Sequence, residues 1–442
     1  MNVSYVSMAF PTSEETFACS DVRALRALGV RLSVYAIRGA RITGLNEPTD
    51  LFRFRARRRA TEQLLAERGL GDLPLSRNTP AAMLRGILFA ATHTGILREL
   101  LSWVWRCNQR SLRHLVKSVA LIPRTLDIFR SIHRERPDVV HLFWGHYPAM
   151  VGYLVRRHLP DIVLSMFLGA YDLERQYPGS AALARSADVV WTHCKHNLSR
   201  VAELGVPRSR LRMVYRGIDV GLFSDGGGEK IPQRIVTAGR LVPEKAMHDV
   251  FAMFAKVLRR WPKASLVVLG DGPERKHLAS QAQTLGVSAA VTFRGHVPSL
   301  DVRDSMASAE VFVLLSRSVS ERLPNVAKEA MASRCACIIS ESPGIEELVE
   351  HGVSGFVVPQ GDIDAAAQHV DQLFRDRARR SAVASVGRAR VLAQFDLNRS
   401  IQAYRDHWIA LLQRRRYNRT GFPAPATEGA AGTRQRATRA AL

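Results

Sequence analysis

The chain has 442 residues, 46% of them hydrophobic, and a formal net charge of +23. This length and apolar content fit two or three folded domains and exclude an intrinsically disordered chain. No stretch has the uncharged apolar length of a membrane span. The odd number of cysteines, five, favours reduced thiols in the cytoplasm.

The first half contains short apolar runs that indicate β-strands at 3–10, 30–37, 138–144 and 161–167. Residues 21–28 fit a helix between the first two of these strands. Strands that alternate with helices predict an α/β domain with a parallel sheet.

A basic segment interrupts this pattern. Residues 51–136 hold 17 lysines and arginines against 6 acidic residues, and the basic residues are interleaved with apolar ones. Such a composition is typical of helices that lie on an anionic bilayer surface. It is also typical of soluble helices that pack on a domain with their arginines in water, and both interpretations stay open. No aromatic stacking platform or zinc-ligand spacing accompanies the segment, so we predict no nucleic-acid partner.

The second half alternates strands and helices more regularly. Apolar runs predict strands at 234–239, 265–270, 291–295, 309–316, 335–340 and 355–358. Repeated βα units of this kind predict a second parallel, doubly wound sheet. A glycine run at 226–230 indicates a hinge between the two halves. The predicted domains are therefore 1–225, with an insertion at 51–136, and 226–395, and a disordered basic tail is expected at 413–442.

Two glutamates with seven residues between them, Glu321 and Glu329, follow the predicted strand at 309–316. Pro324 stands where a helix would begin, and a helix start carries unpaired backbone N–H groups that attract anions. Glu329 would lie about 12 Å further along that helix. A ligand with phosphates and two sets of hydroxyl groups would suit this layout.

Two cations occupy a similar strand-to-helix turn. Arg240 follows the strand at 234–239, and Lys245 comes five residues later. A guanidinium can donate two parallel hydrogen bonds to a phosphate while an ammonium acts as a point charge. Ligands of parallel sheets bind at the carboxyl ends of the strands, where both Arg240 and Glu321 fall. Taken alone, each pair could also be ordinary surface charge.

These motifs together resemble the retaining glycosyltransferases of family 4, which have the GT-B fold and a Glu-x7-Glu signature. The matching segments include AGRLVPEKA, LVVLGDGPERKHL, SERLPNVAKEAMAS and SPGIEELVEHGVSGFVVPQGD, within residues 211–363. The first half matches more loosely, through YVSMAFPTSEETF and DVVHLFWGH. The resemblance implies two Rossmann-like domains that face each other across a cleft. It also implies that a helix at 396–412 crosses back to the first domain.

The resemblance implies specific roles for the charged residues. Glu321 would contact hydroxyl groups of the donor sugar, and Glu329 would bind the nucleotide ribose. Arg240 and Lys245 would hold the pyrophosphate of a UDP- or GDP-linked sugar, with the helix start at Pro324, Asn325 and Val326. We expect no cofactor and no metal, because the cations and the helix start can stabilise the leaving pyrophosphate.

The acceptor side departs from the family. Relatives commonly carry a histidine where this chain has Gly169, so we expect either His146 or no side-chain base at all. Arg322 and Ala246 stand where relatives often have glycine. Arg322 could alter the choice of donor or point outward.

The sequence therefore predicts a retaining, metal-independent glycosyltransferase of exopolysaccharide or other cell-surface glycan synthesis. The expected acceptor is a lipid-linked oligosaccharide, and the expected location is the cytoplasm or the inner face of the plasma membrane. The alternatives are a sugar-nucleotide 2-epimerase and a catalytically inactive, membrane-associated scaffold.

Overall fold

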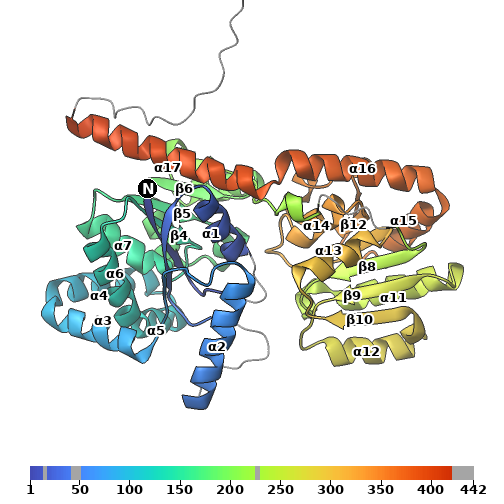
Figure 1. Cartoon of the computed structure of the whole chain (residues 1–442), viewed down its shortest axis with the longest axis horizontal. Coiled ribbons are helices and arrows are strands. Elements are labelled where there is room, and N and C mark those ends of the chain that lie inside the picture. Colours follow the sequence, from blue (N-terminus) through green and yellow to red (C-terminus); the bar gives the residue numbers. More distant parts are fainter. Residues whose placement is uncertain (13–16, 41–50, 224–228, 421–442) are drawn as a thin grey trace, which may run out of the picture.

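A computed structural model describes residues 1–12, 17–40, 51–223 and 229–420. Within them the chain forms two α/β domains, each built on one parallel sheet, which lie side by side (Figure 1). The predicted fold class is confirmed. The hinge expected at 226–230 lies largely outside the described residues.

The first sheet has seven strands among the described residues, in the order β3-β2-β1-β4-β5-β6-β7. Its strands are β1 (Asn2–Ser7), β2 (Arg31–Ala36), β3 (Leu75–Ser76), β4 (Val139–Phe143), β5 (Val163–Phe167), β6 (Val189–Thr192) and β7 (Leu211–Met213). All pairings are parallel, and β1 lies between β2 and β4, with Val3 opposite Leu32 on one side and Val139 on the other. The short strands β3, β6 and β7 were not predicted.

The helices of this half cover both faces of the first sheet. They are α1 (Phe17–Ala27), α2 (Leu51–Glu67), α3 (Pro80–Thr92), α4 (Thr94–Asn108), α5 (Leu112–Ala120), α6 (Ile122–Glu135), α7 (Pro148–His158), α8 (Ala170–Arg175), α9 (Pro178–Ala184) and α10 (His196–Glu203). Strand side chains alternate between two cores: Val140 and Leu142 face one core, and Val139 and Phe143 face the other. Because both faces of the sheet are buried, the sequences of these strands are continuous apolar runs.

The second sheet has six parallel strands among the described residues, in the order β10-β9-β8-β11-β12-β13. Its strands are β8 (Arg234–Ala238), β9 (Ser265–Leu269), β10 (Val291–Gly295), β11 (Val311–Leu314), β12 (Ala336–Ser340) and β13 (Phe356–Val358). Its helices are α11 (Met247–Arg260), α12 (Arg275–Thr284), α13 (Ser299–Ala307), α14 (Asn325–Ala332), α15 (Ile363–Arg375) and α16 (Arg377–Gln394). The strands predicted from the sequence all occur here, with ends shifted by up to two residues.

The last helix, α17 (Leu397–Thr420), runs along the first domain, whereas α16 covers the second (Figure 1). Trp408 is buried in the core that also contains Val139 and Phe143, and its indole Nε1 donates to Ser165 Oγ at 2.9 Å. Ser165 Oγ also accepts from Trp191 Nε1 at 3.1 Å and contacts His141 Nδ1 at 3.0 Å. This hydrogen-bonded centre fixes α17 to β5.

The tail prediction was wrong for residues 413–420, which belong to α17. Arg415, in the part of α17 that was predicted to be disordered, forms an ion pair with Asp188 of the first domain. Its Nη2 lies 2.7 Å from Asp188 Oδ1. Residues 421–442 lie outside the described part of the chain. The five cysteines all lie within the described residues and are free thiols.

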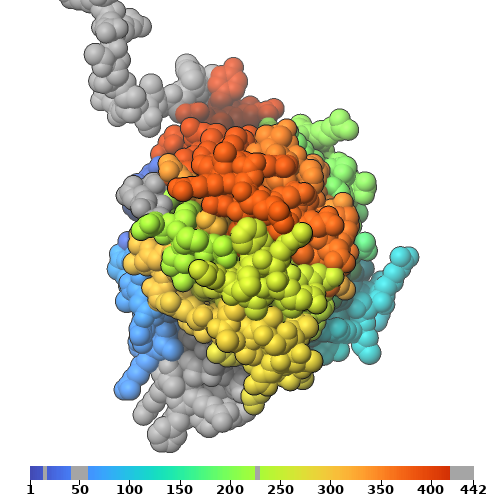
Figure 2. All heavy atoms as spheres, turned by 90° about the vertical axis from the view of Figure 1, so that its right-hand side faces the viewer, coloured from blue at the N-terminus to red at the C-terminus, as the bar shows by residue number. Residues whose placement is uncertain are grey.

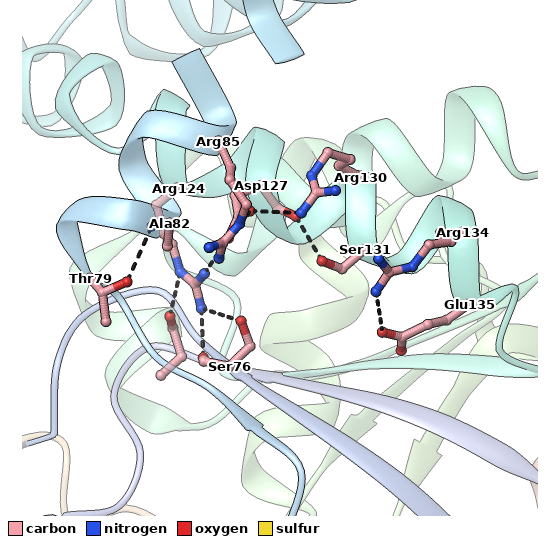
Figure 3. Close-up of polar contacts among 11 residues, drawn as sticks. Ser76, Thr79, Ala82, Arg85, Arg124, Asp127, Arg130, Ser131, Arg134 and Glu135 are labelled. Atoms are coloured by element: carbon pink, nitrogen blue, oxygen red, sulfur yellow. Dashed lines mark hydrogen bonds and ion pairs between the residues drawn. The ribbon is translucent and has the colours of Figure 1, made fainter. Parts of the chain in front are cut away.

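The basic insertion is anchored by a buried ion cluster on α6 (Figure 3). Arg124 and Asp127 are both buried and pair at 2.8 Å, and Arg85 of α3 reaches the same carboxylate at 2.8 Å. Arg124 also donates to the carbonyl oxygens of Ala36 and Ser76. Each buried charge therefore has partners, which its removal from water requires. The cluster joins α3, α6 and the edge of the first sheet.

Candidate active site

The Glu321 loop connects the buried strand β11 to α14. The strand ends at Leu314, and the helix begins at Asn325, one residue later than the sequence predicted, with Pro324 as its N-cap. Pro324 has no side chain that can accept from the first backbone N–H groups, and no side-chain cap is found within the described part of the chain. The helix start is therefore an anion-attracting terminus at the carboxyl end of the sheet.

Lys245 and Glu321 form a direct ion pair. Lys245 Nζ lies 2.7 Å from Glu321 Oε1 and 2.8 Å from Oε2. The two side chains are 18% and 12% exposed, so the pair is largely withdrawn from water. Their loops follow β8 and β11, which are neighbours in the sheet although β9 and β10 come between them in the chain. This is the topological switch point, where ligands of doubly wound sheets bind.

Backbone packing holds the Arg240–Lys245 loop in place. A Cβ at Gly270 would lie 1.9 Å from Gly239 O, and a Cβ at Gly272 would lie 2.4 Å from Leu241 O. The loop after β9 can approach this closely only because it carries glycines. Arg240 itself is exposed at the same edge of the sheet.

Ala246 occupies the position where relatives often have glycine. Its φ is +46°, in the left-handed region that glycine adopts more readily. This conformation ends the short helical turn Pro243–Lys245 and starts α11.

Glu329 lies in the second turn of α14 and is partly buried. Burial raises the pKa of its carboxyl to about 7, and the neighbouring Lys328 lowers it only partly. Burial likewise lowers the pKa of Lys328 to about 7. The Lys328 ammonium donates to the carbonyl oxygen of Arg216 at 2.8 Å and to Asn325 Oδ1 at 3.0 Å.

His146 follows β4 in the first domain, beside the switch point between β1 and β4. Its Nδ1 lies 2.6 Å from Asp172 Oδ1 on α8, and its ring stacks on Tyr171 with centroids 5.2 Å apart. Asp172 also accepts from the backbone N–H groups of Gly145 at 2.9 Å and Gly169 at 3.1 Å. The carboxylate therefore holds the backbone of Gly145 and Gly169 and lies against the imidazole ring.

The structure explains why residue 169 is glycine. A Cβ at this position would lie 2.0 Å from Cζ3 of Trp144, so the indole excludes any larger side chain. Trp144 itself has a φ of +69°, in the sparsely populated left-handed region. The histidine that relatives carry has no room here, and His146 is the imidazole that stands beside the indole, with ring centroids 6.2 Å apart.

Arg322 joins the two domains and does not point outward. It is 2% exposed, its Nη2 lies 2.6 Å from Glu174 Oε1 on α8, and its Nε donates to Asn197 Oδ1 at 3.3 Å. Glu174 also pairs with Arg200 at 2.8 Å. Arg322 therefore connects the Glu321 loop to the short helix that carries Asp172.

A second contact between the domains involves the start of α10. Glu347 of the second domain accepts from the backbone N–H of Lys195 at 2.8 Å and of His196 at 3.0 Å. A carboxylate is favourable at a helix N-terminus, so Glu347 of the second domain caps a helix of the first.

Sequence reasoning missed Asp172, Glu174 and His193. Asp172 could have been found from the turn Gly169-Ala-Tyr-Asp, where an acidic residue caps a helix start. His193 follows β6, a strand that was not predicted, and burial lowers its pKa to about 3. Its Nδ1 is buried without a hydrogen-bond partner among the described residues.

The chain is similar to known glycosyltransferases in sequence and in fold. Residues 226–390 match the family model of glycosyl transferases group 1. The chain is 28% identical over 281 residues to the lipopolysaccharide core biosynthesis glycosyltransferase LpsE of Rhizobium meliloti, covering 60% of this chain and 79% of that one. It is 24% identical over 416 residues to the putative colanic acid biosynthesis glycosyltransferase WcaL of Escherichia coli, covering 91% and 97%.

Among solved structures, HepE of Anabaena in complex with UDP superposes with a TM-score of 0.67 at 16% identity, covering 93% of this chain and all of that one. This similarity shows the fold. The chain thus has the GT-B architecture, and its second domain is similar to the glycosyl transferases group 1 family over residues 226–390.

We expect the Arg322–Glu174 contact to hold the domains together. Arg322→Gln and Glu174→Gln should each destabilise the protein by about 2 kcal/mol, because each leaves a poorly hydrated partner, and the double variant should cost less than the sum. Urea unfolding of the four proteins measures this coupling. The exposed pair Arg294 and Asp301, 3.7 Å apart, is the control and should show less than about 0.5 kcal/mol of coupling. Additive effects of Arg322 and Glu174 would contradict the assignment.

Glu329 should make stability depend on pH. Folding raises its pKa from 4.5 to about 7, so the folded chain retains a proton that the unfolded chain has lost, and stability falls as pH rises between these values. Glu329→Gln should therefore raise the melting temperature by about 2 °C or more at pH 8 and by much less at pH 5. Glu350→Gln, at an exposed glutamate, should change neither. A gain that is equal at both pH values would show that Glu329 does not titrate in this way.

Proposed function

We propose that the chain is a retaining glycosyltransferase that moves a sugar from a nucleoside diphosphate sugar to a lipid-linked oligosaccharide in cell-surface glycan synthesis. The observation that carries the proposal is the Lys245–Glu321 pair beside the uncapped start of α14. The relatives named above act in lipopolysaccharide core and colanic acid biosynthesis, which supports the class of product.

The donor site follows from the charges. An ammonium has three N–H donors. In Lys245 two of them are directed at the two carboxylate oxygens of Glu321, so one remains for a phosphate oxygen. Arg240 and the N–H groups of Asn325 and Val326 would bind the other oxygens. Glu329 would accept from the ribose hydroxyls, and Glu321 from the sugar hydroxyls.

Cleavage of the bond between the sugar and the phosphate leaves negative charge on the diphosphate. Arg240, Lys245 and the α14 terminus would stabilise this charge without rearrangement, which is where preorganised charges are most effective. We therefore propose that the reaction needs no metal ion and no cofactor.

Transfer with retention forms the new bond on the face of the sugar from which the diphosphate departs. The acceptor hydroxyl loses a proton as its oxygen bonds to the anomeric carbon, and an oxygen of the departing phosphate can accept that proton. His146 would contact the acceptor or the sugar. Because its Nδ1 is held by Asp172, Nε2 is the ring nitrogen that remains to do so.

The alternatives predict different products. A 2-epimerase would convert the donor sugar without an acceptor, and a scaffold would bind nucleotide without turnover. The presence of Glu321, Lys245 and an Asp-supported His146 favours an active transferase over a scaffold.

Incubating the protein with UDP- and GDP-linked sugars, with and without a lipid extract as acceptor, tests the proposal. We expect release of nucleoside diphosphate that depends on the acceptor. Glu321→Gln should slow this release about 100-fold or more while changing the dissociation constant of the nucleoside diphosphate less than about threefold, since its partner is the sugar. Glu350→Gln should behave like the parent. Equal losses of turnover and affinity, isomerised donor, or binding without turnover would each contradict the proposal.

A further inference from the structure

The exposed apolar side chains of this protein are concentrated on three consecutive helices of the insertion. Eight of them form what we term the α3–α5 face, and their exposed fractions run from 38% for Leu101 to 75% for Leu112. Its residues are Leu84, Ile87, Leu88, Leu101, Trp105, Leu112, Val116 and Val119. Single exposed apolar residues are ordinary, but a cluster of this kind marks an interaction surface.

The positions of the apolar residues on α3 and α5 show that these side chains do not belong to the hydrophobic core. On α5, Leu112, Val116 and Val119 follow helical spacing on the exposed side, while the small polar Ser118 faces inward. On α3, Leu84, Ile87 and Leu88 point outward, while Gly86 faces α6. The apolar side is thus the outer one on both helices.

The helices are held too tightly to turn this face inward. A Cβ at Gly86 would lie 1.8 Å from the carbonyl oxygen of Pro123, so the backbones of α3 and α6 are in direct contact. Arg85 on α3 is also tied to Asp127 of α6, as Figure 3 shows. Figure 2 shows atoms of α3 and α4, in cyan, projecting past the outline of the second domain.

The charge around this face is positive. Arg98, Arg106, Arg110 and Arg113 are exposed on or beside α4 and α5. Between residues 80 and 120, Glu99 is the single acidic residue, and it is already paired with Arg157 at 2.5 Å and His158 at 3.0 Å. Exposed leucine, valine and tryptophan framed by unopposed arginine is the composition of a surface that rests on anionic lipid.

We infer that the α3–α5 face docks on the surface of an anionic phospholipid bilayer. The apolar side chains would enter the headgroup boundary, and the arginines would contact lipid phosphates. A second copy of the chain is a poor occupant, because a symmetric contact would set the same arginines against each other. No described helix is long and apolar enough to cross a membrane.

The inner side of α5 leads to the acceptor side of the site. His114 of α5 contacts Tyr177 with ring centroids 5.0 Å apart, and Tyr177 contacts His146 with centroids 4.4 Å apart. Between the α3–α5 face and the His146 ring therefore lie α5 itself and two contacting side chains, those of His114 and Tyr177. A lipid-linked acceptor would need to travel only a short way from the bilayer to the site, which is the one respect in which this inference rests on the proposed function.

Vesicle flotation tests the inference with the full-length protein, without donor or acceptor. The parent should float with vesicles of phosphatidylcholine and phosphatidylglycerol, bind far less to phosphatidylcholine alone, and show a blue shift of tryptophan emission that Trp105→Phe reduces. A variant with Trp105, Leu112 and Val116 changed to aspartate should bind anionic vesicles at least about tenfold more weakly. The control changes Leu285, Val353 and Val386, exposed apolar residues of the second domain, to aspartate and should bind like the parent.

Binding of UDP or GDP, unchanged in the triple variant, shows that its fold is intact. Equal vesicle binding by the triple variant and the parent, or no binding of the parent to anionic vesicles, would overturn the inference. Loss of a dimer in the triple variant without loss of vesicle binding would also overturn it. A protein that binds vesicles but transfers no sugar leaves this inference standing and removes the proposed function.

Discussion

Lys245 and Glu321 lie 76 positions apart in the chain, yet their side chains meet at 2.7 Å. A carboxylate that is only 12% exposed needs a partner, and the Lys245 ammonium supplies it. The contact depends on the strand order. The strand β11 pairs with one side of β8, although β9 and β10, which precede β11 in the chain, lie on the other side of β8. The parallel sheet thus decides which loops meet, and the loops carry the charges that a nucleoside diphosphate sugar requires.

The second domain can act on an acceptor only if the first domain is held opposite it. Contacts of charged groups contribute to this, among them Arg322 with Glu174, Glu347 with the start of α10, and Lys328 with the carbonyl oxygen of Arg216. Arg322 is adjacent to Glu321, and Glu174 is two residues from Asp172, which orients His146. The Glu321 loop and the loop that carries His146 are therefore connected through one ion pair and one short helix.

Much of this arrangement could be predicted from the sequence, because it depends on local patterns. The apolar runs predicted the longer strands, and Pro324, after a strand, indicated the helix start. The pairing of Lys245 with Glu321 could not be derived, since it depends on strand order. Arg322 was misread for a similar reason: its buried position exists only where two domains meet. The glycine at position 169 could not be explained from the sequence either, because it is required by a clash with the Trp144 side chain that appears only in the folded structure.

The central claim is that Arg240, Lys245 and the start of α14 bind a diphosphate between the two domains. A crystal structure of the protein with UDP or GDP bound tests it most directly. We predict diphosphate oxygens within hydrogen-bonding distance of Lys245 Nζ, the Arg240 guanidinium and the backbone N–H groups of Asn325 and Val326, with the ribose at Glu329. A nucleotide bound elsewhere, with the Lys245–Glu321 pair undisturbed and the α14 terminus in water, would contradict the account.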